Sequence, residues 1–99
     1  MTVYRIQNKQ DRTRGAYWDL DALSKKRWRN SQPTPDNDKG IERDPIPDEH
    51  CGCKSAAGLL RWFNSAIPDL LRAGYEIVAL RNVTITAVGE YQVLFKWGD

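Results

Sequence analysis

The 99-residue chain has few of the residues that build metal and disulfide sites, with two cysteines and one histidine. Cys51 and Cys53 are one residue apart, which is not the spacing of a secreted disulfide framework. A zinc site needs at least three protein ligands, and no second Cys or His pair accompanies His50, Cys51 and Cys53. We therefore expect no metal and no other cofactor, and interpret both cysteines as small apolar residues on a strand that leads into a helix.

Long apolar runs and glycine-rich motifs are missing as well. No apolar run approaches the length of a membrane-spanning helix, and the first residues contain no apolar core of a signal peptide. None of the seven glycines belongs to a phosphate-binding loop, and one histidine in a loop supports no Ser-His-Asp triad. We expect a cytoplasmic protein that does not bind membranes. These absences favour a protein without catalysis but leave the question open.

The residues that are present predict one domain over 1–99. Hydrophobic residues make up 40% of the chain, and the four tryptophans add large apolar side chains, so one modest core is possible. The net charge of +2 is unevenly spread: residues 1–30 are basic, whereas residues 31–50 are acidic. The basic part either packs beside the acidic one or docks on an acidic partner.

Periodic patterns predict an α+β fold. Alternation predicts a half-buried strand over residues 2–8, and Asp21 could cap a helical turn over 22–28. Ser55 is a suitable N-cap for a helix over 56–64, and a second short helix follows from Pro68 to Gly74. Further strands are predicted over 75–80, 83–88 and 91–97. The expected architecture is a small antiparallel sheet with one or two helices packed on one face.

Particular side chains are expected to face the core of this fold. On the first helix these are Leu59, Leu60, Trp62 and Phe63, and on the second they are Leu70 and Leu71. Gly89 and Glu90 have the form of a tight hairpin turn between the last two strands.

Residues 31–50 are predicted to form a long, irregular, Pro-rich loop. Four of the five prolines and six acidic side chains fall within this stretch, and Ile41 and Ile46 are its only large apolar residues. Because the loop offers few apolar contacts, we expect it to be extended, poorly paired and mobile.

The first candidate site is a basic and aromatic segment. Cations and aromatic rings of this kind can clamp phosphates and stack a base, or form the centre of a protein interface. The alternative is a solvated charged turn anchored by one tryptophan. The predicted partner-binding residues are Trp18, Lys25, Lys26, Arg27, Trp28 and Arg29.

The second candidate site combines Arg5 with Glu90. An arginine on a first strand and a late glutamate are the residues that an ADP-ribosyl-transferring site uses, the arginine to hold the dinucleotide and the glutamate to orient the ribose. The favoured alternative is that Arg5 is an exposed strand residue and Glu90 a turn residue.

Several short motifs resemble a class of small, uncharacterised proteins encoded by phages and prophages. The motifs are Val3-Tyr4-Arg5-Ile6, Gly15-Ala16-Tyr17, Cys51-Gly52-Cys53-Lys54-Ser55, Leu60-Arg61-Trp62-Phe63, Gly74-Tyr75-Glu76-Ile77 and the stretch from Gly89 to Phe95. The resemblance implies a phage accessory protein made in the bacterial host cell. The outline is also distantly similar to a shrunken ADP-ribosyltransferase fold, but Gln92 stands where that family has a second acidic residue.

Three functions follow as hypotheses. The leading one is a non-catalytic protein that binds and inhibits or modulates a host protein complex, such as a nuclease, a defence effector or a replication or recombination enzyme. The alternative is a minimal ADP-ribosyl-transferring enzyme that uses Arg5 and Glu90. The third is a nucleic-acid-binding module that uses the basic segment.

Overall fold

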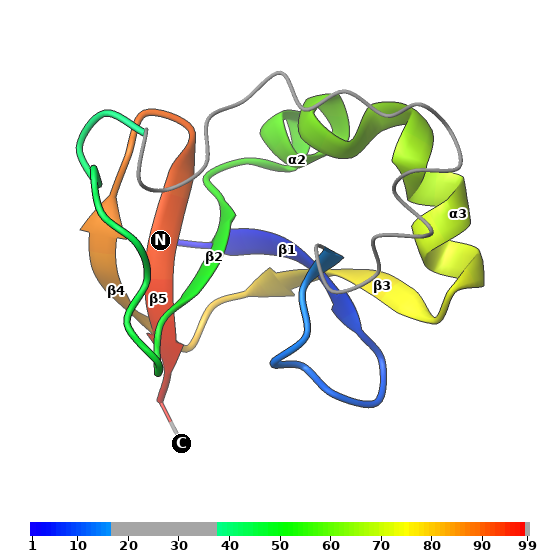
Figure 1. Cartoon of the computed structure of the whole chain (residues 1–99), viewed down its shortest axis with the longest axis horizontal. Coiled ribbons are helices and arrows are strands. Elements are labelled where there is room, and N and C mark those ends of the chain that lie inside the picture. The colour runs from blue at the N-terminus through cyan, green and yellow to red at the C-terminus, as the bar shows by residue number, and fades with distance from the viewer. Residues whose placement is uncertain (17–37, 99) are drawn as a thin grey trace.

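The computed structural model describes residues 1–16 and 38–98, which form a five-stranded antiparallel sheet with a helical layer (Figure 1). The strand order is β3-β1-β2-β5-β4. The strands are β1 (Val3–Asn8), β2 (His50–Cys53), β3 (Tyr75–Leu80), β4 (Val83–Val88) and β5 (Gln92–Trp97). Helix α2 (Ala56–Phe63) continues through the 3-10 turn η3 (Asn64–Ala66) into α3 (Ile67–Arg72). The predicted α+β class is confirmed.

Two parts of the prediction are not tested by this fold. The helical turn expected over 22–28 lies outside the described residues, and the assignment of the whole chain to one domain stays a prediction. None of the helices in the described part of the chain has the length and apolarity that a membrane crossing requires.

The helices begin and end where the sequence predicts. The Ser55 hydroxyl accepts a hydrogen bond of 3.0 Å from the Gly58 N–H, which satisfies one free donor at the start of α2. Gly74 follows α3 with a φ of 95°, a left-handed conformation that suits glycine. On α2 the predicted core side chains Leu59, Trp62 and Phe63 are buried.

Two leucines expected in the core are on the surface instead. Leu60 is 50% exposed and Leu71 is 46% exposed. Each follows a fully buried leucine, and consecutive helical positions are about 100° apart around the axis, so both members of such a pair cannot face the same sheet. The predicted apolar face of each helix was therefore too wide.

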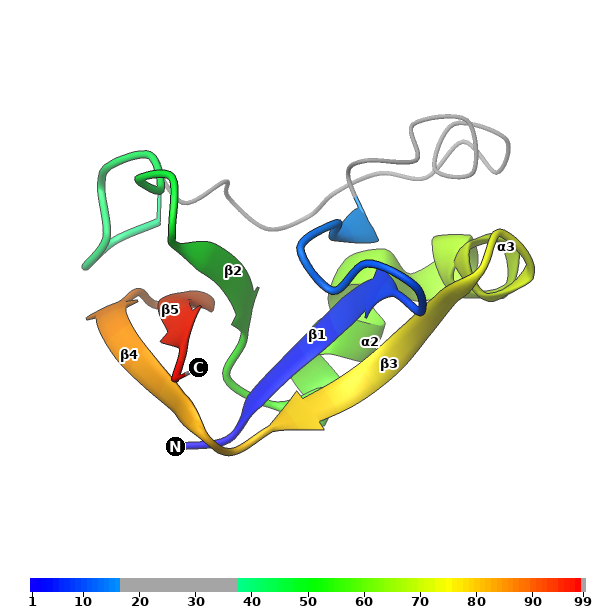
Figure 2. The same cartoon turned by 90° about the horizontal axis from the view of Figure 1, so that it is seen from below.

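Strand β1 confirms the strand predicted over residues 2–8, but it is buried on both faces and not half-buried as expected. Figure 2 shows the sheet bent into two limbs, with β3 and β1 in one limb and β2, β5 and β4 in the other. One face of β1 places Ile6 under the helices, and the other places Val3 among side chains of β5. Arg5 lies on the same side as Val3 and is 5% exposed, so it is not an exposed strand residue.

The β4–β5 hairpin forms as predicted, but its turn includes Tyr91 as well as Gly89 and Glu90. Asp38 caps this turn: its carboxylate accepts hydrogen bonds from the N–H groups of Glu90, Tyr91 and Gln92, the last at 2.8 Å. A Cβ at Gly89 would collide with that carboxylate, which explains the glycine.

Three side chains hold the described part of the Pro-rich loop beside the sheet. Residues 38–49 lie along one face of β4 and β5 (Figures 1 and 2), with Ile41 and Glu49 buried in addition to Asp38. His50, which was assigned to the loop, is the first residue of β2. Residues 42–48 between these buried side chains are exposed and irregular, and the expectation of an extended, poorly paired loop over 31–50 stays a prediction. Mobility of the loop stays a prediction.

Candidate functional site

The most distinctive site of the described chain lies where β1 and β2 separate. The two strands share one register pair, Tyr4 with Cys53, and then diverge. Divergence leaves the Cys51 carbonyl without a strand partner on that side. The side chain of Arg5 fills the gap, and its terminal nitrogen Nη1 donates a hydrogen bond of 2.6 Å to this carbonyl.

Arg5 also holds the loop that follows β1. Its second terminal nitrogen, Nη2, donates to the carbonyl oxygens of Arg12 at 3.3 Å and Thr13 at 3.4 Å. Gly15 lies against the guanidinium, since a Cβ there would be 3.3 Å from Nη2. Arg5 thus joins β1, β2 and the loop, which is a structural role that requires a fork of several donors.

The guanidinium carries a buried charge without a carboxylate partner among the described residues. Its Cζ atom lies 5.7 Å from the ring centroids of both Phe95 and Trp97, which gives the charge two aromatic neighbours. Its Nε is buried and has no hydrogen-bond acceptor. Burial lowers the pKa of Arg5, but an arginine remains protonated at physiological pH.

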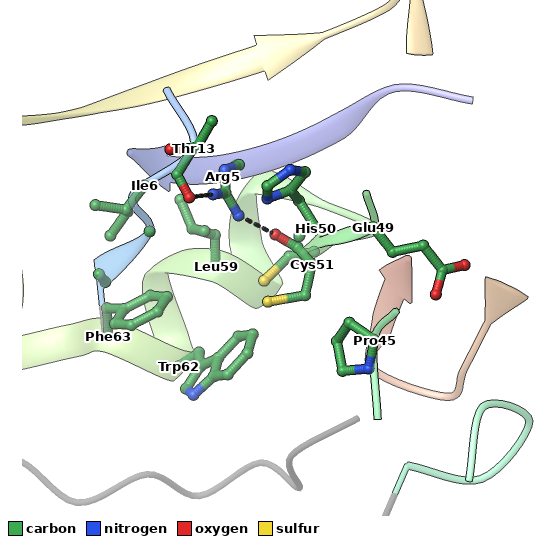
Figure 3. Close-up of a pocket in the computed structure, with 14 residues that line it drawn as sticks. Arg5, Ile6, Thr13, Pro45, Glu49, His50, Cys51, Leu59, Trp62 and Phe63 are labelled. Atoms are coloured by element: carbon green, nitrogen blue, oxygen red, sulfur yellow. Dashed lines mark hydrogen bonds between the residues drawn. The ribbon is translucent and has the colours of Figure 1, made fainter. Parts of the chain in front are cut away.

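A cavity of about 200 Å³ adjoins this arginine. Figure 3 shows the guanidinium between Thr13 and Cys51 on one side of the cavity, with Trp62 and Phe63 of α2 on the other. Leu59 and Pro45 add apolar walls. We call this cavity and its lining the Arg5 pocket; it combines one buried cation with apolar and aromatic walls.

The cysteines of β2 line the Arg5 pocket as neutral thiols. Burial raises the pKa of Cys51, and burial together with Cys51 raises the pKa of Cys53 to about 12. A thiol with a raised pKa is a poor nucleophile because the thiolate is the reactive form. These surroundings agree with the interpretation of both cysteines as packing residues.

The histidine of the pocket is also neutral near physiological pH. Burial lowers the pKa of His50, and the positive charges of Arg5 and Arg12 lower it further. Its ring lies 4.6 Å from that of Trp97. In the part of the chain that the structure describes, no three His, Cys, Asp or Glu side chains are grouped as metal ligands.

Glu49 lies at the rim of the Arg5 pocket but does not balance the charge of Arg5. Its two carboxylate oxygens accept hydrogen bonds of 2.6 and 2.8 Å from Arg43. These bonds, together with one from Thr86, hold the pKa of Glu49 well below its usual range. The carboxylate therefore stays ionised and remains engaged by Arg43.

A second concavity lies where the connection between β3 and β4 meets the end of β5. This basic groove has a volume of about 470 Å³ and is lined by Arg12, Ala79, Leu80, Arg81, Asn82, Val83, Trp97 and Gly98. The Cζ atom of Arg12 lies 4.6 Å from the Trp97 ring centroid. The lining residues include two cations and an aromatic ring but no carboxylate.

Comparison with known proteins identifies the family. A family model described as the bacteriophage T4 Y00F protein matches residues 1–99. The chain belongs to this family. The predicted phage origin is thereby confirmed. Neither the curated proteins nor the solved structures contain a match, so the distant likeness to ADP-ribosyltransferases stays a prediction.

The sequence-predicted site residues of this Y00F family member fall into two groups. The partner-binding set lies outside the described residues; it consists of Trp18, Lys25, Lys26, Arg27, Trp28 and Arg29. Arg5 and Glu90 are described, and no hydrogen bond or ion pair joins them. Glu90 is exposed in the β4–β5 turn, whereas Arg5 is buried against β2.

Sequence reasoning did not find the Arg5 pocket as a site. Its lining comes from four separate stretches of chain, and no local spacing relates Thr13 to Pro45 or Trp62. The one available signal was a charged residue in the middle of an apolar strand, at Arg5.

Proposed function

We propose that this phage protein binds a host protein complex and inhibits or modulates it without catalysis. The main observation behind the proposal is that Arg5 is a structural residue, because its side chain hydrogen-bonds to the backbone of the protein itself. The catalytic alternative needs this guanidinium for a dinucleotide, but it instead donates to three backbone carbonyls and is 5% exposed. With Arg5 engaged and both thiols neutral, the described sheet supports a scaffold better than an enzyme.

The proposed contact is the basic segment Lys25–Arg29 together with Trp18. Arginine and tryptophan dominate the energy of many protein interfaces, and clustered cations speed association with an acidic surface. The segment supplies both residue types within a few positions. The described residues on either side of the stretch that contains it are anchored: the loop before it is held by Arg5, and Asp38 after it accepts from the β4–β5 turn.

The test is capture of host proteins by the tagged full chain, identification of the captured protein, and reconstitution with that protein in purified form. The triple variant Lys26→Glu/Arg27→Glu/Trp28→Ala is expected to fold, to lose binding and to leave the host complex active. A matched control, Lys9→Glu/Arg61→Glu, changes exposed cations elsewhere and is expected to bind like the original chain. Undiminished binding by the triple variant would refute the proposed contact.

The same experiment addresses the enzymatic alternative. If the ADP-ribosyl group of a labelled nicotinamide dinucleotide is transferred to the captured protein with release of nicotinamide, and Glu90→Ala abolishes the transfer, the protein is an enzyme and the proposal fails. Modulation of the purified target with no nucleotide present is the expected result.

Nucleic-acid binding is a second candidate because of the basic groove. In this hypothesis Arg12 and Arg81 contact phosphates, and a base stacks on Trp97 in place of the Arg12 guanidinium that lies over the ring. Binding to single-stranded DNA would quench tryptophan fluorescence and weaken steeply with salt. Arg12→Ala/Arg81→Ala should then reduce affinity, whereas an unchanged affinity in this variant would exclude the groove.

A further inference from the structure

Arg5 has no carboxylate partner in residues 1–16 and 38–98, and its buried charge gives the Arg5 pocket a chemical preference that the proposed host binding does not require. A buried cation is costly unless it is paired, and its removal from water is only partly offset by carbonyl oxygens and aromatic rings. Arg5 has three carbonyl acceptors and two aromatic neighbours but no carboxylate among the described residues. An anion in the adjoining cavity would supply the missing charge.

One donor remains for such an anion. A guanidinium has five N–H groups. The described hydrogen bonds use both terminal nitrogens: Nη1 makes one and Nη2 makes two. Nε is buried and has no partner among the described residues, whereas the Cys51 side chain is a further hydrogen-bond partner of the guanidinium.

The one acidic residue of the described lining, Glu49, cannot serve as the counterion of Arg5. Glu49 is held by Arg43 through both carboxylate oxygens. His50 does not compete for an anion, because its lowered pKa leaves it uncharged near neutral pH. Arg5 is therefore the one charged group of the described lining that lacks an ionic partner.

The rest of the lining selects for an apolar body. Trp62 and Phe63 form one side of the cavity, opposite the guanidinium (Figure 3), and Leu59 is a further apolar lining residue. Pro45 is exposed at another edge, where the cavity reaches the surface. An apolar cavity of about 150 Å³ holds a benzene-sized molecule, so a cavity of about 200 Å³ has room for one ring with a small substituent.

We propose that the Arg5 pocket binds a small organic carboxylate with a flat, apolar body. The carboxylate accepts hydrogen bonds from Arg5, and the body packs against Trp62 and Phe63. The pairing neutralises the buried charge, so ligand binding also stabilises the fold.

The test uses the full chain and three probes: benzoate, its neutral isostere benzamide, and inorganic phosphate. Titration followed by nuclear magnetic resonance should show saturable binding of benzoate, with shifts at the Arg5 Nε–H and the Trp62 indole. Benzamide can also accept a hydrogen bond from the guanidinium but carries no charge, so only benzoate forms an ion pair and should bind about tenfold or more tightly. Phosphate, which lacks an apolar body, should bind more weakly than benzoate.

Two variants show which arginine causes the preference for benzoate over benzamide. Arg5→Met should remove the preference for benzoate over benzamide. Arg12→Met removes the same charge from an exposed residue outside the lining, and should leave the preference unchanged. If Arg5→Met does not fold, the Nε–H shift in the original chain decides the matter alone.

Four results would overturn the proposal. They are the absence of saturable benzoate binding at millimolar concentrations, equal binding of benzamide, tighter binding of phosphate, and benzoate binding that leaves the Arg5 Nε–H unshifted. None of them bears on the capture of a host protein, so the two proposals can fail separately.

Discussion

Arg5 and Cys51 are joined by a hydrogen bond of 2.6 Å across 46 residues of sequence, from a guanidinium nitrogen to a backbone carbonyl oxygen. The bond closes the space between two strands that share a single register pair. The bond satisfies one donor of a buried charged side chain. The other terminal nitrogen of Arg5 holds the loop after β1 through the carbonyls of Arg12 and Thr13.

Replacing Arg5 with lysine should destabilise the protein although the charge is kept. An ammonium group is compact and cannot reproduce the fork that serves three separate carbonyls. Leaving buried acceptors unsatisfied costs about 1–3 kcal/mol, which urea denaturation would measure. Arg14→Lys, at an exposed position of the neighbouring loop, should change the free energy of unfolding by less than about 0.5 kcal/mol. Equal losses in both variants would show that the Arg5 geometry does not matter.

The buried face of α2 can be tested with two residues of the same helix. Phe63 is 4% exposed, and Phe63→Ala should lower the free energy of unfolding by about 3–5 kcal/mol through loss of contacts and a cavity. Leu60→Ala removes a side chain that is half exposed and should cost less than about 1 kcal/mol. The reverse order in urea denaturation would mean that the helix packs through its other face.

Asp38 should be essential for the β4–β5 turn. Asp38→Ala leaves the N–H groups of Glu90, Tyr91 and Gln92 without their acceptor. Hydrogen bonds to a charged group are individually strong, so we expect a loss of about 3 kcal/mol or more. Amide hydrogen exchange at residues 90–92 should accelerate in this variant and stay slow in Asp44→Ala, which alters an exposed carboxylate of the same loop.

The Arg43–Glu49 pair predicts a loss of stability in acid. Because the pKa of Glu49 is lower in the folded chain than its ordinary value of 4.5, the pair contributes its full stability above that value. The contribution is lost as the pH falls towards the depressed folded-state pKa. Thermal unfolding measured across this range should show a smaller acid-induced decline in Glu49→Gln than in the original chain. An identical decline would show that the carboxylate is not engaged by Arg43.

The two thiols should react slowly in the folded protein. Their pKa values are raised by burial, so little thiolate is present near neutral pH. Mass spectrometry after treatment with iodoacetamide should find both cysteines unmodified in the native state and alkylated in urea. Rapid native labelling of Cys51 would point to a reactive thiol and reopen the question of catalysis.

Patterns among neighbouring residues were sufficient to predict most of the helices and strands. Ser55 and Gly74 mark the ends of the helical layer through backbone chemistry that depends on neighbours in the sequence. The predicted strands over 75–80 and 83–88 match β3 and β4, since β-branched and aromatic side chains suit an extended backbone. Such features are set by residues a few positions apart, so the sequence by itself determined them, along with the α+β class.

Tertiary structure decided which side chains are buried and what they do there. Arg5 and Gln92 lie on strands whose alternation of polar and apolar residues predicts one solvent-exposed face. In the structure β1 and β5 are interior strands of a bent sheet, and both side chains are buried. The contacts of Arg5 with Cys51 and of Asp38 with the β4–β5 turn span about half the chain. No local pattern encodes them, because a buried charge acquires its partners only when the strands have come together.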